Sequence, residues 1–269
     1  MYMQFELEAK KSLGQNFLKN TTIIKKMVDE CVSIAKNYTN THKKEVSILE
    51  IGPGTGALTT HLLETNLTVQ AIEADDRAIP LLTEKFAVQI EKSVFSLIHE
   101  DIRTYDVKKN VTPYIIVANI PYYLTGFIIR KFLESNHQPI AMILMVQKEV
   151  AVRILDKKHS LASLGVLTYG KPRILTHVSK GNFVPMPKVD SSVLIIENIH
   201  HDMFTNTKEE ETYWELAKKA FGNKRKQLGG TVLKNINIPE LKQYATKRPE
   251  DLSIEDWIYI SKTYTARNK

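Results

Sequence analysis

The sequence is poor in cysteine: Cys31 is the only one in 269 residues. A single cysteine excludes a disulfide framework within the chain and fits a reducing compartment. Cys31 falls among Ile24, Met27, Val28 and Val32 at helical spacing. We therefore expect a thiol buried in the core rather than a nucleophile.

Long apolar segments are also absent, because no run reaches the ~18 residues that a membrane-spanning helix needs. The first eight residues include Glu6 and Glu8 but no arginine. This composition argues against both secretory and mitochondrial import signals. We therefore expect a cytoplasmic protein with no membrane partner, and we expect it to be a monomer.

The composition is otherwise that of a globular protein with an excess of positive charge. Hydrophobic residues make up 43% and charged residues 25%, so the chain can bury a sizeable core. Its length fits one large domain, or a large domain and a small one. The net charge of +7 and the pI near 9.2 favour a polyanionic partner, although many basic proteins bind no nucleic acid.

Apolar runs bounded by turn residues predict seven strands with helical segments between them. The predicted strands are 46–51, 68–73, 94–98, 114–118, 140–146, 173–178 and 192–196; the predicted helices include 57–64, 124–133, 148–155 and 161–167. Residues 37–45 are expected to form a solvated loop. Beyond residue 200 the pattern changes to helices separated by polar breaks. We therefore predict an α/β domain with an N-terminal arm over residues 1–203 and a small all-helical domain over 204–269.

The stretch before the first helix is polar and irregular. It places two amide side chains, Gln15 and Asn16, on a loop directly before a helix that Asn20 or Thr21 can cap. On composition alone, an arm packed on the core is the better interpretation.

A glycine-rich turn, Gly52-Pro-Gly-Thr-Gly56, follows the first predicted strand and precedes a helix. Glycines let a ligand approach the backbone, and a helix N-terminus favours anionic groups. This unit predicts a cofactor loop that includes Gly52 and Gly54. The glycine spacing differs from the dinucleotide fingerprint, and Glu50 before the loop would repel a pyrophosphate but could help to hold a cationic ligand.

Acidic residues end or follow the next two strands. Glu73 lies at the end of the second strand, where a carboxylate can accept both hydroxyls of a ribose. Asp101 follows the third strand and could accept from an adenine amine, while Ile102 could flank the ring. An ordinary surface glutamate is the alternative interpretation of Glu73.

The chemistry is predicted at Asn119-Ile-Pro-Tyr122, after the apolar run 114–118. The Asn119 amide offers an acceptor oxygen, Pro121 holds the next backbone carbonyl at a fixed angle, and Tyr122 gives a flat face. Two acceptors on an exocyclic amine would localise the nitrogen lone pair while the ring stacks on Tyr122. A simple strand-to-helix turn is the alternative.

Phe183 lies in loop 181–188, which two prolines stiffen. We expect the loop to expose this ring, so that it could sandwich a planar substrate against Tyr122. Packing of the ring beneath the loop is the competing explanation.

Basic residues cluster in the C-terminal part, at Lys218, Lys219, Lys224, Arg225 and Lys226. A solvated helix end is the usual meaning of such a cluster. Because the same chain has a turn that can accept a base, contact between this cluster and RNA phosphates becomes a stronger alternative interpretation. Further along, Ser253 with Asp256 resembles a capping box at the start of the last helix.

Six motifs occur in an order that closely resembles the ribosomal RNA adenine dimethyltransferases, specifically those that modify small-subunit RNA. They are Lys11-Ser-Leu-Gly-Gln-Asn-Phe-Leu18, Leu49-Glu-Ile-Gly-Pro-Gly-Thr-Gly-Ala-Leu-Thr59, Ala71-Ile-Glu-Ala-Asp75, Val117-Ala-Asn-Ile-Pro-Tyr-Tyr-Leu124, Met145-Val-Gln-Lys-Glu-Val-Ala151 and Phe183-Val-Pro-Met-Pro-Lys-Val-Asp-Ser-Ser192. The resemblance covers nearly all of residues 10–197 and continues more weakly through 221–228. The ordered set is far more specific than any one motif.

The resemblance implies a seven-stranded Rossmann-like methyltransferase sheet whose last strand is antiparallel. It also implies S-adenosylmethionine as methyl donor, no metal, and small-subunit ribosomal RNA or the pre-ribosomal small subunit as partner. Two methyl groups would be added to N6 of each target adenine, with two adjacent adenines as targets.

Residue roles follow from the matched motifs. In the cofactor site, Asn16 and Leu18 would border the methionine end, Gly52 would lie in the loop, Glu73 would take the ribose and Asp101 the adenine amine. Asn119 would contact both cofactor and target. Tyr122 and Phe183 would stack on the flipped adenine.

The sequence departs from the family pattern at three places. Leu124-Thr-Gly-Phe127 stands where the family commonly has Ile-Thr-Ser-Pro, residues 164–171 lack an expected Gln-Tyr-Tyr, and Gly229-Gly230 follows the basic cluster. These departures leave the methyl-transfer residues in place but put ribosome docking in question. Three rival functions remain. They are an antibiotic-resistance enzyme that dimethylates large-subunit RNA, an assembly factor that acts mainly by binding, and a nicotinamide oxidoreductase, which the glycine spacing makes the least favoured.

Overall fold

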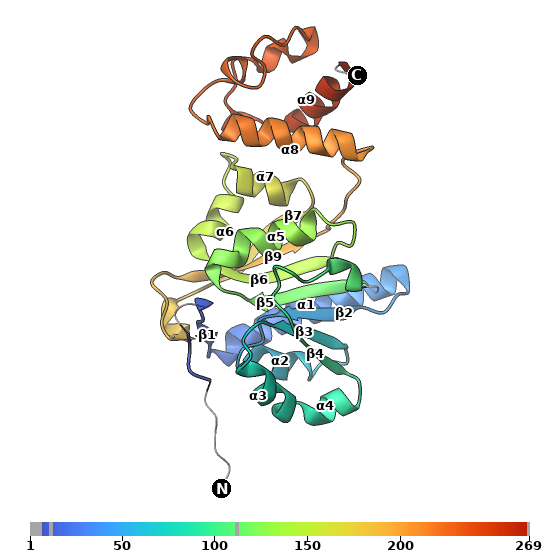
Figure 1. Ribbon diagram of the computed structural model, residues 1–269, viewed down its shortest axis with the longest axis vertical. Helices are drawn as coiled ribbons and strands as arrows, with labels where there is room; N and C mark the ends of the chain where they lie inside the picture. The colour runs from blue at the N-terminus through green and yellow to red at the C-terminus, as the bar shows by residue number, and fades with distance from the viewer. Residues whose placement is uncertain (1–6, 11–12, 111–112, 268–269) are drawn as a thin grey trace. The chain divides into compact units, whose positions relative to one another are not determined.

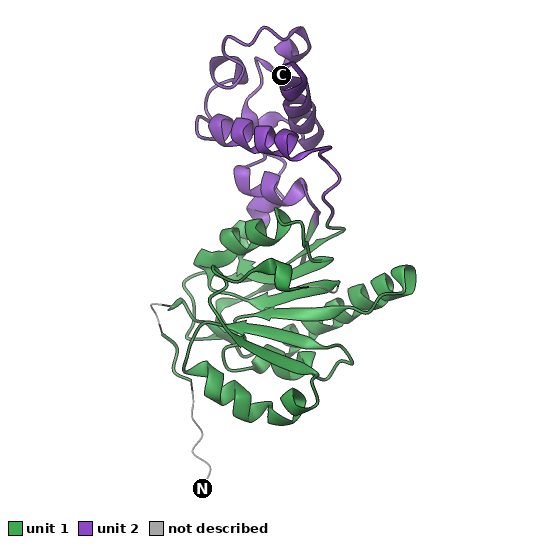
Figure 2. Cartoon of the chain, turned by 45° about the vertical axis from the view of Figure 1, so that its right-hand side comes forward, with its two compact units in different colours: residues 1–151, 172–199 green, residues 152–171, 200–269 purple. Residues whose placement is uncertain are grey.

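The computed structural model describes residues 7–10, 13–110 and 113–267 (Figure 1). The motif residues Lys11 and Ser12 lie outside the described part. The chain divides into two compact units, which Figure 2 colours separately. The first comprises residues 1–151 with 172–199, and the second comprises 152–171 with 200–269.

A seven-stranded sheet forms the centre of the first unit, in the order β4-β3-β2-β5-β6-β9-β7. The strands are β2 (Ser47–Ile51), β3 (Val69–Glu73), β4 (Phe95–His99), β5 (Tyr114–Asn119), β6 (Ala141–Gln147), β7 (Lys171–Val178) and β9 (Ser191–Glu197). The first five pair in parallel, whereas β9 runs antiparallel to β6. All seven predicted strands are therefore present within two residues of their expected ends, and the antiparallel last strand is confirmed.

Strands β5 and β6 lie in the interior of the sheet. Residues 114–118 and 141–146 are buried without interruption, as expected for strands that helices cover on both faces. The core continues into α1 through Ile24, Met27 and Cys31. Cys31 is fully buried, and burial raises its pKa to about 12, which confirms the core thiol.

Helices lie before, between and after the parallel strands. They are α1 (Thr21–His42), α2 (Ala57–Leu62), α3 (Ala78–Lys85), α4 (Ala87–Glu91), α5 (Thr125–Leu133) and α6 (Lys148–Ile154). A two-stranded sheet pairs β1 (Phe17–Leu18) with β8 (Phe183–Val184). Asn20 caps α1, because its side-chain oxygen accepts from the N–H groups of Thr22 and Ile23 at 2.9 and 3.2 Å.

The loop predicted over residues 37–45 is wrong for residues 37–42. Helix α1 continues to His42, although this last part is polar. The Thr41 hydroxyl donates to the Asn37 carbonyl, and the rings of Tyr38 and His42 stack. Lys43, in the left-handed conformation with φ of 54°, ends the helix.

The second unit is helical, with α7 (Leu161–Leu167), α8 (Thr207–Phe221) and α9 (Ile254–Arg267). Three 3₁₀ segments lie between α8 and α9 in the described chain. Its core includes Tyr213 and Trp257, both fully buried. The predicted capping box at Ser253 is present, since Ser253 and Asp256 exchange side-chain to backbone hydrogen bonds at 3.1 Å. The predicted boundary at 203/204 remains a prediction. The compact unit itself begins at residue 200 and also includes 152–171.

None of the helices in the described residues is long and apolar enough to cross a membrane.

Candidate functional site

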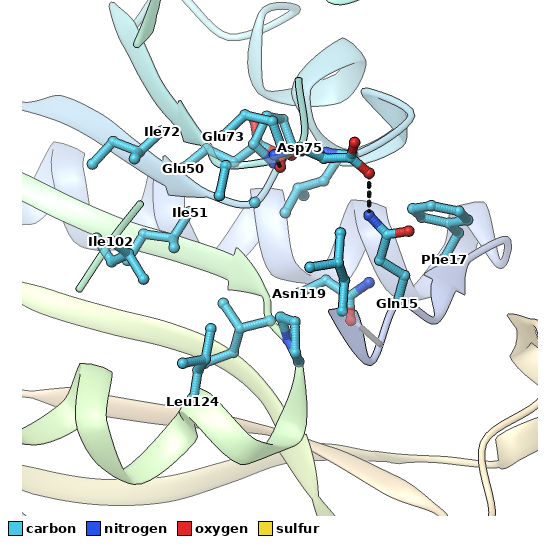
Figure 3. Close-up of a pocket in the computed structure, with 18 of the residues that line it drawn as sticks. Gln15, Phe17, Glu50, Ile51, Ile72, Glu73, Asp75, Ile102, Asn119 and Leu124 are labelled. Carbon is cyan, nitrogen blue, oxygen red and sulfur yellow. Dashed lines mark hydrogen bonds between the residues drawn. The ribbon is translucent and has the colours of Figure 1, made fainter. Parts of the chain in front are cut away.

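A cavity opens at the carboxyl ends of β2, β3 and β5 in the first unit (Figure 3). Ligands of open α/β sheets bind at this edge. Of the predicted site residues, the cavity is lined by Asn16, Leu18, Gly52, Gly54, Glu73, Asp101, Ile102, Asn119 and Tyr122. The fold therefore brings together residues from five separate segments of the sequence.

The glycine loop after β2 is shaped by positive backbone angles. Gly52, Gly54 and Gly56 have φ of 70°, 57° and 72°, a region that glycine enters at little cost. A Cβ at Gly54 would lie 2.9 Å from the Phe17 ring, whereas a Cβ at Gly52 would meet no atom within 4 Å. The backbone at Gly52 is therefore open to the cavity.

Glu50 lies beneath this loop and is 1% exposed. Burial, and to a lesser degree the nearby Glu73 carboxylate, raise its pKa to about 8, while Thr59 and Lys85 act in the opposite direction. Its Oε2 atom has no hydrogen-bond partner among the described residues. The raised pKa favours the neutral acid in the free protein, and a cationic ligand group beside Glu50 would favour the ionised form, which accepts hydrogen bonds.

Glu73 is 6% exposed and is hydrogen-bonded within the site. Its Oε2 accepts from the Gly54 N–H at 2.9 Å and its Oε1 from the Asp75 N–H at 2.8 Å. Burial still raises its pKa above the ordinary value. The carboxylate thus links the end of β3 to the glycine loop and keeps acceptor capacity for a ligand.

Asp101 is bound by a neighbour that the sequence did not single out. The Arg103 guanidinium donates to both Asp101 oxygens, with its Nη2 at 2.6 Å from Oδ2 and its Nε at 3.0 Å from each oxygen. This pairing lowers the pKa of the Asp101 carboxyl. An adenine amine would have to share or displace an Arg103 contact. The next residue, Ile102, is 5% exposed and lines the cavity.

The N-terminal arm lines the cavity through Leu13 and residues 15–18. Asn119 Nδ2 donates to the Asn16 carbonyl at 3.0 Å, and Gln15 Nε2 donates to Asp75 Oδ2 at 2.9 Å. The second bond is drawn in Figure 3. The Asp75 side chain is 1% exposed, and its pKa falls to about 2, chiefly because Arg77 donates to it.

Gln15 and Asp75 were not among the predicted site residues. The sequence signal for these two residues was weak. Each lies in one of the six motifs, but neither lies at the end of a predicted strand or helix. Their contact joins positions 60 apart in the chain, which local patterns do not reveal.

The Asn119 turn closes the cavity at the end of β5. Pro121 has a backbone ψ of 132° and its carbonyl accepts from the Leu124 N–H at 3.0 Å, which leaves one lone pair. The Tyr122 hydroxyl lies 2.6 Å from Ser191 Oγ, so the ring is held from β9. An amide, a carbonyl and an aromatic ring are thus collected in one turn.

The prediction that loop 181–188 exposes Phe183 is wrong. Phe183 is 2% exposed, belongs to the hydrophobic core and does not line the cavity. The reason is the pairing of β8 with β1, which sets Phe183 opposite Leu18. The competing explanation, packing beneath the loop, describes its position, and stacking on a target base stays a prediction that would require the ring to leave the core.

The predicted RNA-binding cluster lies in the second unit. Lys218 and Lys219 are in the last turn of α8, and Lys224, Arg225 and Lys226 follow that helix. All five residues are exposed, so they are available to a polyanion.

Comparison with known proteins gives one family. The model of a family described as ribosomal RNA adenine dimethylase matches residues 6–265. A protein named ribosomal RNA small subunit methyltransferase A from Mycoplasmopsis pulmonis is 38% identical over 262 residues, covering 93% of this chain and 97% of the relative. A protein of the same name from Dehalococcoides mccartyi is 32% identical over 275 residues, covering 97% and 90%.

Solved structures give the same fold. A dimethyladenosine transferase from Plasmodium falciparum is similar with a TM-score of 0.76 at 23% identity, covering 94% of this chain and 98% of that chain. The 23S rRNA methyltransferase ErmE is similar with a TM-score of 0.72 at 19% identity, covering 92% and 99%. At these identities the likeness concerns the fold alone.

Proposed function

Because the chain belongs to the ribosomal RNA adenine dimethylase family, we propose that it transfers methyl groups from S-adenosylmethionine to N6 of adenines in small-subunit ribosomal RNA. Two methyl groups are added to each base, on two adjacent adenines. The protein acts as a monomer in the cytoplasm, on the small subunit or its precursor.

One observation carries this proposal: the glycine loop after β2 and the Asn119 turn after β5 line the same cavity. A methyl donor and a nucleophile must meet within van der Waals distance, and a shared cavity is what such a transfer requires.

The lining fits S-adenosylmethionine. The unpaired Glu50 Oε2 can accept from a cationic ligand, and Gly52 leaves its backbone open. We assign Glu73 to the ribose, Asp101 and Ile102 to the adenine, Asn16 and Leu18 to the methionine end, and Gly52 and Gly54 to the loop that holds it. When bound, this cofactor supplies an activated methyl group.

Asn119 prepares the nucleophile. Its Nδ2 is engaged by the Asn16 carbonyl, so its Oδ1 is left to accept an N–H of the target amine. The Pro121 carbonyl offers the second acceptor. With both N–H groups held, the nitrogen lone pair is directed for in-line attack. As the nitrogen–carbon bond forms, the carbon–sulfur bond of the donor would break and a neutral thioether would leave. The cationic amine would lose one N–H proton, so no strong base is needed beforehand.

Tyr122 supplies the surface on which the extruded adenine stacks. Its ring is half-buried and its hydroxyl is fixed by Ser191. A second methylation at the same nitrogen requires room for one methyl group beside the Asn119 turn.

Two other functions are weighed against this one. An enzyme that methylates large-subunit RNA can have this fold, as ErmE does. The relatives described above, which are at least 32% identical to this chain, carry the small-subunit name instead. An assembly factor that acts by binding needs no cavity at the Asn119 turn. If Asn119→Ala abolished methylation yet fully restored assembly in cells, the binding role would dominate.

The test is mass spectrometry of RNA nucleosides. The purified protein is incubated with S-adenosylmethionine and either small-subunit particles or protein-free large-subunit RNA. We expect dimethyladenosine in the small-subunit RNA. Product confined to the large-subunit RNA would identify the rival enzyme, and absence of product from both would remove the proposed activity.

A further inference from the structure

A group of exposed apolar side chains lies on the loop over residues 184–190, which we call the rim loop. Val184, Met186 and Val189 are 45%, 63% and 44% exposed, and none of them is used by the proposed chemistry. Single exposed apolar residues are ordinary on protein surfaces. Three within six positions, at the edge of a cavity, are typical of a contact surface.

The rim loop is anchored beside the cavity at both ends. At its start, Val184 pairs with Phe17 across β1 and β8, and Phe17 lines the cavity. Figure 1 labels β1, the strand to which Phe17 belongs. At its end, Ser191 hydrogen-bonds to Tyr122, on which the target base would stack. The loop is therefore fixed at one end to the arm that lines the cavity and at the other end to the turn on which the target base would stack.

The middle of the rim loop is also fixed. Pro187 is buried, while its neighbours Met186 and Lys188 are exposed. A buried proline between two exposed residues makes the loop stiff, because its φ is locked. Met186 and Lys188 are thus presented to solvent from a rigid support.

The charge around the rim loop favours a polyanion. Lys180 and Lys188 are exposed, and the one acid of the loop, Asp190, accepts from the Lys180 backbone N–H at 3.0 Å. Tyr123 follows Tyr122, the residue that Ser191 contacts, and its side chain is 63% exposed. The Tyr123 ring packs against Gly14 of the arm, where a Cβ would lie 3.1 Å from the ring. Apolar and aromatic groups next to lysines are suited to nucleotide bases and phosphates.

We propose that the rim loop binds the nucleotides on either side of the target adenine, with Met186 inserted into the space that the extruded base leaves. This proposal rests on the proposed function. An enzyme that modifies a base must take it out of the stack, which costs free energy. Apolar wedges, methionine among them, occupy unstacked base steps in nucleic-acid-binding proteins, and a thioether makes favourable contacts with aromatic rings. Lys188 contacts a phosphate of the same strand.

The test compares Met186→Ala with two control variants. Met186→Leu keeps an apolar side chain of similar volume, and Val88→Ala removes an exposed apolar residue, 56% exposed, from α4, outside the cavity lining. One substrate is a small-subunit RNA fragment in which the target adenines are stacked on their neighbours. The other is the same fragment with abasic nucleotides on either side of the target adenines, so that those neighbours cannot stack on them. 2-Aminopurine at the target position reports extrusion by its fluorescence.

We expect Met186→Ala to lower kcat/KM for the stacked RNA by about tenfold and to reduce the fluorescence rise, with the KM for S-adenosylmethionine unchanged. In the RNA with abasic neighbours, the kcat/KM of Met186→Ala should return to the wild-type value. Both control variants should behave as wild type on both RNAs. Equal losses on the two RNAs, a loss in Val88→Ala, or wild-type kinetics in Met186→Ala would each overturn the wedge. An inactive wild-type protein would instead contradict the proposed function.

Lys188→Gln tests the phosphate contact separately. We expect the slope of log K against log salt for RNA binding to become shallower by about 0.7–0.9, the value for one lost contact. An unchanged slope would remove Lys188 from the interface.

Discussion

The orientation of one amide governs the proposed chemistry at the scale of the residue. Asn119 is held through Nδ2 by a backbone carbonyl of the N-terminal arm. A carbonyl can only accept, so this bond determines which end of the amide faces the arm. The acceptor oxygen is thereby left for a substrate amine.

Asn119→Ala removes that acceptor. We expect a loss of roughly 2–4 kcal/mol of transition-state stabilisation, the scale for a positioned polar group in a water-excluded site. The measurement is kcat/KM for RNA methylation, with cofactor affinity measured separately. Asn37→Ala, on the exposed part of α1, is the matched control, and an Asn119→Ala rate within twofold of wild type would contradict the assignment.

Glu50 should make the stability of the cofactor-free protein depend on pH. Its folded pKa of about 8 lies above the ordinary 4.5, so the folded state binds this proton more tightly than the unfolded state. The stabilisation is complete below about pH 4.5 and is lost as pH rises through about 8.

Glu50→Gln removes this titration. We expect the free energy of unfolding of wild type to fall relative to the variant between pH 4.5 and 8, by an amount on the order of 2–5 kcal/mol. Denaturant unfolding of both proteins at several pH values measures it. Parallel curves would mean that Glu50 is ionised in the free protein.

At the scale of the element, the N-terminal arm is held to the first unit by three contacts. Its backbone is held at Glu8 by Arg77 and at Asn16 by Asn119, and its Gln15 side chain is held by Asp75. Gln15, Asn16, Asp75 and Asn119 line the cavity, so under the proposed function the arm contributes to the cofactor site rather than only covering the core. Asp75 itself stays paired with Arg77 if Gln15 is removed.

Gln15→Ala should therefore loosen the arm without unfolding the unit. We expect cofactor affinity to fall by about 10- to 150-fold, the range for a hydrogen bond to a charged group. Isothermal titration with S-adenosylmethionine measures the affinity, and hydrogen exchange of residues 13–18 measures the arm. Gln89→Ala in α4 is the control. An unchanged affinity with increased exchange would separate the arm from cofactor binding.

Charge is the property that belongs to the whole molecule. The excess of +7 raises association with RNA at low salt, and the exposed basic cluster in the second unit concentrates part of it. Any phosphate that this cluster neutralises releases counterions, which is measurable as a salt dependence.

Replacement of Lys224, Arg225 and Lys226 by glutamine should weaken RNA binding and make the salt slope shallower by up to about 2–3. A triple replacement of Lys36, Lys43 and Lys44, exposed at the end of α1, changes the net charge equally and serves as control. Binding isotherms from 50 to 200 mM salt give the slopes. If both triple variants change the slope equally, only the net charge matters.

The sequence by itself determined the sheet and the edge at which the site lies. Alternating apolar runs and turn residues are local signals, so all seven strands and the Ser253 capping box were predictable. Because parallel strands end at one edge, the motifs after β2, β3, β4 and β5 had to meet there.

Only the tertiary structure decided how side chains pair across the site. Asn119 and Asn16 are 103 positions apart, and Phe183 is buried because β8 pairs with β1. Arg103 donates hydrogen bonds to Asp101. Both residues belong to one short turn, but the sequence pattern gives no side-chain direction and so did not predict this pair. Residues 152–171 join the second unit. These outcomes depend on long-range contacts and on competition for the same acceptors, which no local period encodes.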